Sequence, residues 1–214
     1  MMLYEKYRPK SWDEILGQEQ AVNVMHRLRK TGLGGHALWV SGPSGVGKSS
    51  LARLAAMEIA DPFNIEEYDA GRLTDKWVEE IERSLHSYRI GEKTGVAVIV
   101  NEAHAMKAPV VRQLLVTLER IPHHALWVFT TSLKGQLSLF DKSDDASPLL
   151  SRCICLTLKA TGLDLAFAIR AREIAQENCL DGAPLEDYIG LAKSCRANFR
   201  EMLCQIEAGG MLSH

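Results

Sequence analysis

Residues 42–50 read GPSGVGKSS and combine glycines with a lysine and hydroxyl side chains. They satisfy the pattern G-x-x-x-x-G-K-[ST] through Gly42, Gly47, Lys48 and Ser49. Glycines let the backbone curl around an anion, and a helix that begins near the lysine adds the positive end of its dipole. The lysine would contact the β- and γ-phosphates, and the serine hydroxyl would bind Mg²⁺. A glycine-rich turn that only opens a helix is the alternative. We predict a loop that binds a nucleoside triphosphate through Gly42, Pro43, Ser44, Gly45, Val46, Gly47, Lys48, Ser49 and Ser50.

Residues 96–104 read VAVIVNEAH, an apolar run that ends in polar residues. This pattern is typical of a buried parallel strand that leads into a site. Many nucleotide hydrolases carry two adjacent carboxylates there, one for the Mg²⁺ shell and one that activates water. Here Asn101 precedes Glu102, so an acceptor oxygen remains but one negative charge is lost. We expect Mg²⁺ to be held by Ser49 and Asn101, Glu102 to act as the base, and hydrolysis to be slow. Asn101→Asp is then expected to raise turnover or Mg²⁺ affinity.

The elements that must position these residues alternate between strand-like and helix-like segments. Such alternation predicts an α/β fold, with a parallel sheet flanked by helices on both faces. Thr74 is expected to cap its helix. The expected strands are residues 37–41, 63–70, 96–100, 125–132 and 153–160, and the expected helices are residues 19–32, 51–60, 74–89 and 107–121.

The pattern changes after residue 160. Residues 162–179, 185–195 and 198–209 are all helix-like. We therefore predict an α/β nucleotide-binding domain at 1–160 with an insertion at about 134–147, followed by a small helical lid domain at 161–214.

Composition limits the class of protein. The 214 residues carry a net charge of −2, with 25 basic and 27 acidic side chains, so no basic surplus indicates a nucleic-acid binder. No apolar run has the length of a membrane span, and the N-terminus lacks the apolar core of a secretory signal. Five cysteines without CxxC pairs indicate reduced thiols, and we predict a cytoplasmic protein.

Several segments, taken in order, resemble one family, the AAA+ ATPases of the DNA sliding-clamp loader. Residues 5–22 (EKYRPKSWDEILGQEQAV) are similar to the opening of replication factor C small subunits. Residues 114–132 (LLVTLERIPHHALWVFTTS) are closer to the bacterial gamma/tau subunit. LLSRC at 149–153 and ANFREML at 197–203 match motifs of both. The resemblance covers nearly the whole chain.

The resemblance implies roles for individual residues. Thr131 would be the first sensor beside the γ-phosphate, and Arg152 an arginine finger that completes the site of a neighbouring subunit in trans. Arg200 would be the second sensor, which reaches from the lid to the γ-phosphate, with Arg196 as the alternative. Ordinary strand-end, surface or packing roles are the alternatives. The residues that would border the adenine are Tyr7, Arg8, Pro9 and Leu16.

The sequence also departs from the family. The family's collar domain, which joins the subunits of a clamp loader, would require roughly one more domain than the 214 residues hold. The zinc-binding cysteines of the gamma/tau type are also missing from this sequence. Val116 stands where that type has a lysine, although Lys107 and Arg112 remain on the same expected helix. Contact with DNA through this helix is therefore left open.

A polar insertion carries a second short motif. Residues 136–140 read QLSLF and resemble the peptide with which bacterial polymerases dock on the sliding clamp. Three apolar side chains would enter a pocket on the clamp, and the glutamine would meet its polar rim. The alternative is that they pack on their own domain. The predicted clamp-binding residues are Gln136, Leu137, Ser138, Leu139 and Phe140.

Two classes of function stay open. Glu102, Thr131, Arg152 and Arg200 favour an oligomeric ATPase, working with other AAA+ subunits, that acts on the clamp or on DNA. Asn101, and apolar residues such as Val116 where the family has basic ones, favour a module that docks on the clamp and uses ATP mainly as a structural ligand. A helicase-loader type of replication regulator would share the nucleotide site without needing the insertion.

Overall fold

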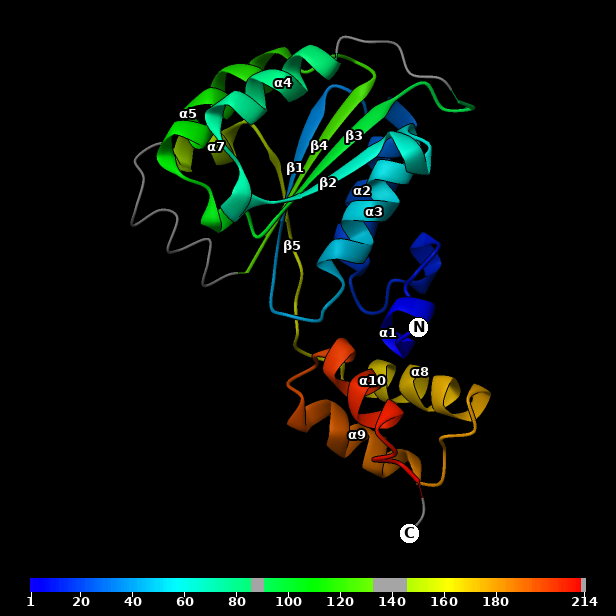
Figure 1. Ribbon diagram of the computed structural model, residues 1–214. Helices are drawn as coiled ribbons and strands as arrows, with labels where there is room; N and C mark the ends of the chain where they lie inside the picture. The colour runs from blue at the N-terminus through cyan, green and yellow to red at the C-terminus, as the bar shows by residue number, and fades with distance from the viewer. Residues whose placement is uncertain (86–90, 133–145, 213–214) are drawn as a thin grey trace.

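The computed structural model describes residues 1–85, 91–132 and 146–212 (Figure 1). Its centre is a five-stranded sheet in the order β2-β3-β4-β1-β5, in which every adjacent pair of strands is parallel. The predicted α/β class is confirmed. The strands are β1 (His36–Ser41), β2 (Ile65–Asp69), β3 (Val96–Asn101), β4 (Ala125–Thr131) and β5 (Ile154–Thr157).

Helices cover both faces of the sheet (Figure 1). On one face α2 (Glu19–Thr31) and α3 (Lys48–Ile59) share a core with side chains such as Val40 and Val128. On the other face α4 (Asp75–Leu85), α5 (Ala108–Thr117) and α7 (Ala146–Ser151) lie beside a second core that contains Trp39 and Trp127. Since β1, β3 and β4 are covered on both sides, their residues are apolar without alternation.

Local signals explain where several elements begin and end. The segment expected as a strand at 63–70 starts only at Ile65, because residues 62–64 form a short 3-10 turn. The strand expected at 153–160 is likewise shorter, from Ile154 to Thr157. Thr74 caps α4 as predicted, since its hydroxyl oxygen accepts a hydrogen bond from the Trp77 N–H at 3.2 Å.

The remaining short elements connect these layers. Helix α5 ends at Thr117 and continues as a 3-10 turn. Within the described residues, none of the helices combines the length and apolar character that crossing a bilayer requires. The short elements are α1 (Leu3–Lys6), η1 (Trp12–Glu14), η2 (Pro62–Asn64), η3 (Ala70–Arg72), η4 (Ala103–Ala105) and η5 (Leu118–Arg120).

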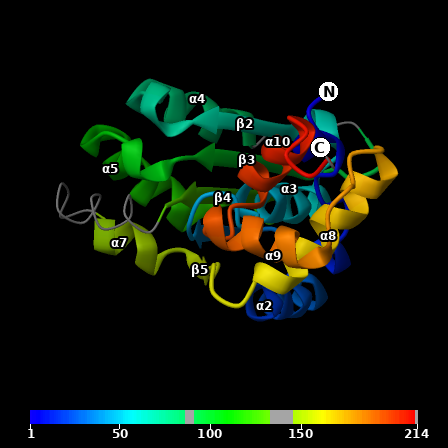
Figure 2. The ribbon, with the colours of Figure 1, turned by 90° about the horizontal axis from the view of Figure 1, so that it is seen from below.

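A helical lid follows the sheet. It consists of α8 (Asp164–Glu177), α9 (Leu185–Ser194) and α10 (Phe199–Glu207), and it lies beyond one end of the strands (Figure 1, Figure 2). The fully buried Ile174, Tyr188 and Met202 join these helices in one core. The predicted lid is therefore confirmed as a fold feature, whereas a domain boundary at residues 160 and 161 stays a prediction.

The N-terminal segment fastens the lid to the sheet. Gln18, which is 3% exposed, donates to the backbone oxygen of Lys159 at 2.8 Å and accepts from its N–H at 3.0 Å. Gly17 has a φ of +66°, which disfavours other residues, and a Cβ there would lie 2.1 Å from Leu163 Cδ2, so the Leu163 side chain would have to shift. Further along, Asn178 in the lid donates to the Tyr7 hydroxyl at 2.8 Å. These contacts hold the N-terminal segment against the lid and against the chain that leads from β5 into the lid.

Candidate nucleotide-binding site

The carboxyl ends of the strands face the lid, because β5 runs directly into it and the other strands are parallel to β5. The loop after β1 and the turn after β3 therefore meet the N-terminal segment and the lid around one cleft. This is where open α/β sheets place their ligands. The residues that line the cleft are Tyr4, Tyr7, Arg8, Pro9, Glu14, Ile15, Leu16, Ser44, Gly45, Val46, Gly47, Lys48, Ser49, Ser50, Glu102, Thr130, Phe167, Arg170, Phe199, Arg200 and Leu203.

The loop between β1 and α3 depends on glycine at two positions. Gly47 caps α3 in a left-handed conformation, with φ 102°. Gly45 has φ 77°, and a Cβ there would lie 1.8 Å from the Asn198 side-chain oxygen of the lid. The lid also touches the loop directly, since the Phe199 N–H donates to the Gly45 oxygen at 3.3 Å. Loop and lid are thus in contact across the cleft.

Lys48 lies at the base of the loop. Its ammonium donates to the backbone oxygens of Gly42 at 3.0 Å and Pro43 at 2.6 Å. Burial lowers the pKa of Lys48 below its ordinary value; the Glu102 carboxylate opposes this shift, and the Arg200 guanidinium adds to it. The side chain thus senses both the carboxylate in the turn after β3 and the guanidinium on the lid. A phosphate in the cleft would supply the anion that favours its charged form.

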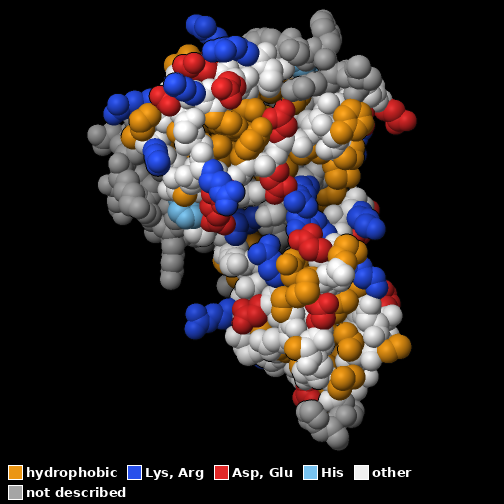
Figure 3. Space-filling view, in the orientation of Figure 1, with side chains coloured by type: hydrophobic (Ala, Val, Ile, Leu, Met, Phe, Trp, Pro, Cys, Tyr) orange, Lys and Arg blue, Asp and Glu red, His pale blue; other side chains and the backbone are white. Residues whose placement is uncertain are grey.

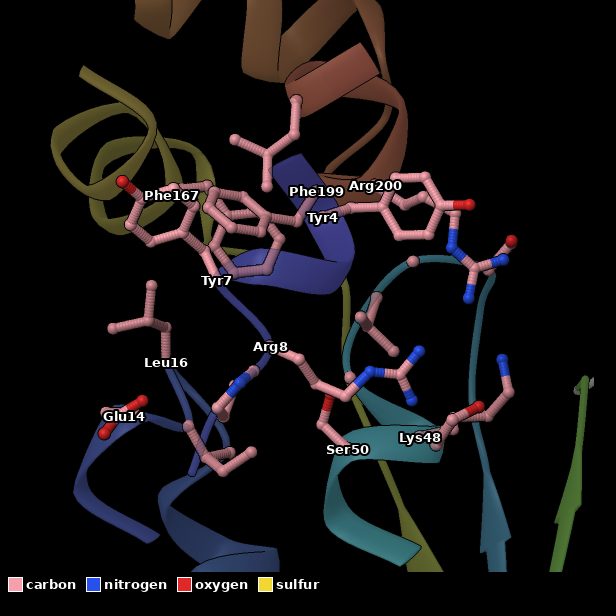
Figure 4. Close-up of a pocket in the computed structure, with 18 of the residues that line it drawn as sticks. Tyr4, Tyr7, Arg8, Glu14, Leu16, Lys48, Ser50, Phe167, Phe199 and Arg200 are labelled. Atoms are coloured by element: carbon pink, nitrogen blue, oxygen red, sulfur yellow. The ribbon is translucent and has the colours of Figure 1, made fainter. Parts of the chain in front are cut away.

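The cleft has an aromatic end at the lid and an opposite end formed by the loop after β1 (Figure 4). Tyr4, Tyr7, Phe167 and Phe199 lie toward the lid, and the rings of Phe167 and Phe199 are 4.9 Å apart. The loop and its helix, including Lys48, form the opposite end (Figure 4). Such a division suits a ligand with a planar base at one end and phosphates at the other.

Basic side chains predominate over acidic ones in the cleft. Among its described lining residues, Arg8, Lys48, Arg170 and Arg200 are basic, whereas Glu14 and Glu102 are acidic. Figure 3 shows Lys and Arg side chains, with acidic ones among them, gathered at the waist between the sheet and the lid. The local excess of positive charge favours an anionic ligand, although the chain as a whole is slightly acidic.

Glu102 lies in the cleft wall in an unusual backbone conformation. Its φ of 53° and ψ of 45° are left-handed, which costs a non-glycine residue about 1–3 kcal/mol. The turn aims its carboxylate into the cleft, and its Oε2 lies 3.4 Å from His104 Nδ1. His104 Nδ1 is also 3.1 Å from the Thr131 hydroxyl. One imidazole therefore links the predicted base to the predicted first sensor.

The two threonines at the end of β4 point to opposite faces of the sheet. Thr130 lies in the cleft wall and shares the α3 face with Val128. Thr131, which is 0% exposed, shares the opposite face with Phe129 and reaches His104 instead. Of these two, only Thr130 contributes to the cleft wall, and strand alternation explains why. A sensor role of Thr131 stays a prediction, and it would have to act through His104.

Asn101 lies beside the cleft rather than in its wall. Its amide oxygen accepts a hydrogen bond from the Thr130 hydroxyl at 2.8 Å, and its amide nitrogen donates to Glu67 at 2.6 Å. The turn after β3 therefore has a second carboxylate nearby, although it comes from β2 and not from the adjacent position in the chain.

The two predicted arginines differ in position. Arg200 lines the cleft, with its guanidinium carbon 5.5 Å from the centre of the Tyr4 ring. Arg152 lies outside the cleft wall, and its Nε donates to the Glu119 carboxylate at 3.2 Å while Nη2 contacts the same oxygen. Its Nη1 donates to the Pro148 oxygen at 2.9 Å. Arg152 is thus held within its own chain, away from its own cleft.

The structure brings most predicted nucleotide-binding residues together. Gly42 and Pro43 lie behind the cleft wall and contact Lys48 through their oxygens. The predicted clamp-binding residues 136–140 lie outside the described part of the chain. The predicted residues found in the wall are Tyr7, Arg8, Pro9, Leu16, Ser44, Gly45, Val46, Gly47, Lys48, Ser49, Ser50, Glu102 and Arg200.

Sequence reasoning missed several residues of the wall. Strand alternation would have found Thr130, and the helical spacing of Phe167 and Arg170 indicates a shared face of α8 without saying what that face meets. The missed residues are Tyr4, Glu14, Ile15, Thr130, Phe167, Arg170, Phe199 and Leu203.

A phosphate-binding loop, a strand-end glutamate and a lid arginine around one cleft, on a parallel sheet, define a nucleotide-binding ATPase fold. The family described as "ATPase family associated with various cellular activities (AAA)" matches residues 38–153, and the chain belongs to this family. The resemblance to clamp-loader ATPases is also confirmed, because curated relatives include a DNA polymerase III subunit and a replication factor C subunit.

Those relatives are longer than this chain. DNA polymerase III subunit tau/gamma of Haemophilus influenzae is 26% identical over 228 residues, covering 94% of this chain and 31% of that protein. The replication factor C small subunit of Picrophilus torridus is 24% identical over 182 residues, covering 83% of this chain and 54% of that protein. In fold, the chain is similar to the Holliday junction branch migration motor RuvB of Thermotoga maritima, with 22% identity and a TM-score of 0.67. The match covers 94% of this chain and 64% of the RuvB chain.

Proposed function

We propose that this chain is a clamp-loader-like ATPase subunit that binds ATP with Mg²⁺ in the cleft and hydrolyses it slowly. The observation that carries the proposal is the meeting of Lys48, Glu102 and the lid residue Arg200 around one cleft. A loop that only opened a helix would not need a carboxylate and a lid arginine directed at the same space. The family membership supports the same reading.

Different parts of the cleft would bind different parts of ATP. The base would lie against Tyr7 and Phe167, and the phosphates would lie on the loop and the amino end of α3. Glu102 would accept a proton from the attacking water. Arg200 would contact the γ-phosphate from the lid, so that the lid position depends on the nucleotide state.

Side chains at the start of α3 and at the end of β3 suit a hard cation. Ser49 offers a hydroxyl in the cleft wall, and Asn101 offers an amide oxygen beside it, both of which are ligand types that Mg²⁺ takes together with phosphates and water. These two residues would hold Mg²⁺, and the ion would neutralise charge on the phosphates. Slow turnover is proposed because Asn101 brings no negative charge to the site.

Glu102→Gln tests the hydrolytic part of the proposal. The amide cannot accept the proton, so turnover should fall by about 10²–10⁴-fold while ATP affinity stays within about twofold. Phosphate release and calorimetry measure the two quantities. Glu80→Gln, an exposed change on α4, is the matched control. Turnover by Glu102→Gln equal to that of the unchanged chain would refute its role as base.

We further propose a role in DNA replication or repair, in the cytoplasm, together with other AAA+ subunits and a bacterial-type sliding clamp. The names of the curated relatives and the QLSLF motif at 136–140 support this role. Contact with DNA is not part of the proposal, because the net charge is −2. A nucleotide-gated docking module is the second candidate, favoured by Asn101, and an assembly that binds the clamp but releases no phosphate would support it.

The docking motif gives a separate prediction. A peptide of residues 134–144 should bind a bacterial sliding clamp at micromolar affinity, as expected for a short segment that orders on binding. Replacing Leu139 and Phe140 with Ala removes two apolar anchors worth about 1.5–3 kcal/mol each, so affinity should fall at least about a hundredfold.

Competition between the whole protein and a labelled clamp-binding peptide measures this interaction, with Ser143→Ala, outside the motif, as the control. The double variant should fail to compete and should still bind ATP. If the unchanged protein does not displace the peptide at high micromolar concentration, with or without ATP, the motif match is accidental.

A further inference from the structure

Glu67 on β2 lies beside Asn101 because of the register of two parallel strands. Glu67 is paired with Ile99 of β3, so its side chain is on the same face as Ile99 and Asn101. The Asn101 amide nitrogen is 2.6 Å from Glu67 Oε1. The other oxygen of Glu67 is held by Arg53 on α3, whose Nη2 is 2.7 Å and whose Nε is 2.9 Å away. The carboxylate is therefore fixed from both sides.

This carboxylate determines which way the Asn101 amide points. An ionised carboxylate only accepts hydrogen bonds, so the NH₂ group of Asn101 must face Glu67. The amide oxygen then faces the other way, toward Thr130, whose hydroxyl donates to it at 2.8 Å and which lies in the cleft wall. Without Glu67, either end of the amide could be turned toward the cleft.

A chain of hydrogen bonds connects α3, the helix that carries Ser49, to the cleft wall. Arg53 is one helical turn after Ser49 on α3, and from Arg53 the contacts lead through Glu67 and Asn101 to Thr130 at the cleft. Glu67 thus places a carboxylate behind Asn101, where it is paired with Arg53 and fixes the direction of the Asn101 amide.

We propose that Glu67 is the positioning residue of the Mg²⁺ site: by accepting a hydrogen bond from the Asn101 NH₂ group, it keeps the Asn101 oxygen on the side of the cleft, where the metal would be held. The inference rests on the proposed function, since it concerns the metal of the same site. It also replaces the expectation that Asn101→Asp alone raises turnover. Aspartate at 101 would set one carboxylate against another where the structure has an amide-to-carboxylate hydrogen bond.

The first test measures how strongly Mg²⁺ enhances nucleotide binding. The ratio of ADP affinity with Mg²⁺ to affinity in EDTA should fall about tenfold in Glu67→Gln, as for other changes behind a metal ligand. Affinity in EDTA should stay unchanged, whereas a merely structural role would lower both affinities together. Glu66→Gln, next in the strand and on the opposite face, should leave the ratio unaltered. An unaltered ratio in Glu67→Gln would overturn the proposal.

The second test is a double-mutant cycle. Asn101→Asp alone should lower the thermal midpoint of the nucleotide-free protein by about 2–4 °C and should not raise the Mg²⁺ ratio. In Glu67→Gln/Asn101→Asp the carboxamide of position 67 can donate to the new carboxylate, so the midpoint should recover and the Mg²⁺ ratio should exceed that of the unchanged protein. Additive midpoints, or an Asn101→Asp variant with a raised ratio, would overturn the proposal.

The two tests also separate this inference from the proposed function. Binding of ADP to the unchanged protein is measured first, and its absence would refute the proposed nucleotide site. The thermal cycle uses protein without nucleotide or metal, so it tests the Glu67–Asn101 pairing in either case.

Discussion

Lys48→Ala is expected to abolish the binding of ATP and ADP. The ammonium now donates to two backbone oxygens of the loop, and in the complex those hydrogen bonds would pass to the β- and γ-phosphates. Hydrogen bonds to charged groups contribute about 1.5–3 kcal/mol each. The loss of two such bonds corresponds to at least about a hundredfold in affinity, since about 1.4 kcal/mol is a factor of ten.

Calorimetry with Mg²⁺ and either nucleotide measures this change, and Lys76→Ala, an exposed lysine on α4, serves as the control. The nucleotide-free variant should unfold at a temperature no lower than that of the unchanged protein. The reason is that Lys48 is a partly buried cation whose pKa is lowered by desolvation, so its removal relieves an unfavourable partial burial. A variant that keeps its affinity would refute the phosphate-loop assignment.

The central part of the fold could be predicted because it is buried on both sides. β1, β3 and β4 consist of continuous apolar residues that end in polar site residues, which is a signal contained in the sequence itself. The edge strands β2 and β5 were predicted too long. Their ends depend on which neighbours they pair with and on local turns such as residues 62–64, and neither follows from periodicity alone.

The candidate site, too, could be predicted only in part. The position of the glycine-rich loop between β1 and α3 could be predicted, because its spacing is the one that lets a backbone fold around an anion; that the loop binds phosphate stays a prediction. The lid residues Phe167 and Arg170 could not, because their approach to the loop depends on contacts such as that between Gln18 and Lys159. The pairing of Glu67 with Asn101 requires the register of β2 and β3, which one sequence does not contain.

The remaining prediction concerns Arg152, which is paired with Glu119 within its own chain. Its Nε and Nη2 both contact the Glu119 carboxylate, and the arginine side chain is 30% exposed, so it is accessible from outside the chain. An ion pair this exposed is worth at most about 1 kcal/mol. A γ-phosphate presented by a neighbouring subunit would be a stronger partner for the planar guanidinium, because charge-assisted bidentate bonds to phosphate are stronger. The intrachain pair therefore orients the arginine without preventing a role in trans.

Arg152→Ala is accordingly expected to reduce turnover in an assembled oligomer by about 10³-fold or more, the range measured for arginine fingers. Nucleotide affinity of the isolated chain should not change, because Arg152 lies outside its own cleft. Glu119→Gln, which keeps the shape of the partner and removes its charge, should leave turnover within a few fold and serves as the matched control.

Mixing the Arg152→Ala and Lys48→Ala chains gives the sharper test. Neither should release phosphate alone, since one has no finger and the other has no phosphate ligand. In a mixed assembly the intact loop of the first chain meets the intact Arg152 of the second, so a fraction of sites is complete and activity should return in proportion to that fraction. Recovery depends on the two residues belonging to different chains. If Arg152→Ala alone keeps full activity in an assembly shown to be oligomeric, or if mixing restores nothing while both chains co-assemble, Arg152 does not act in trans, and its contact with Glu119 is then a structural one that ties the end of α7 to the turn after α5.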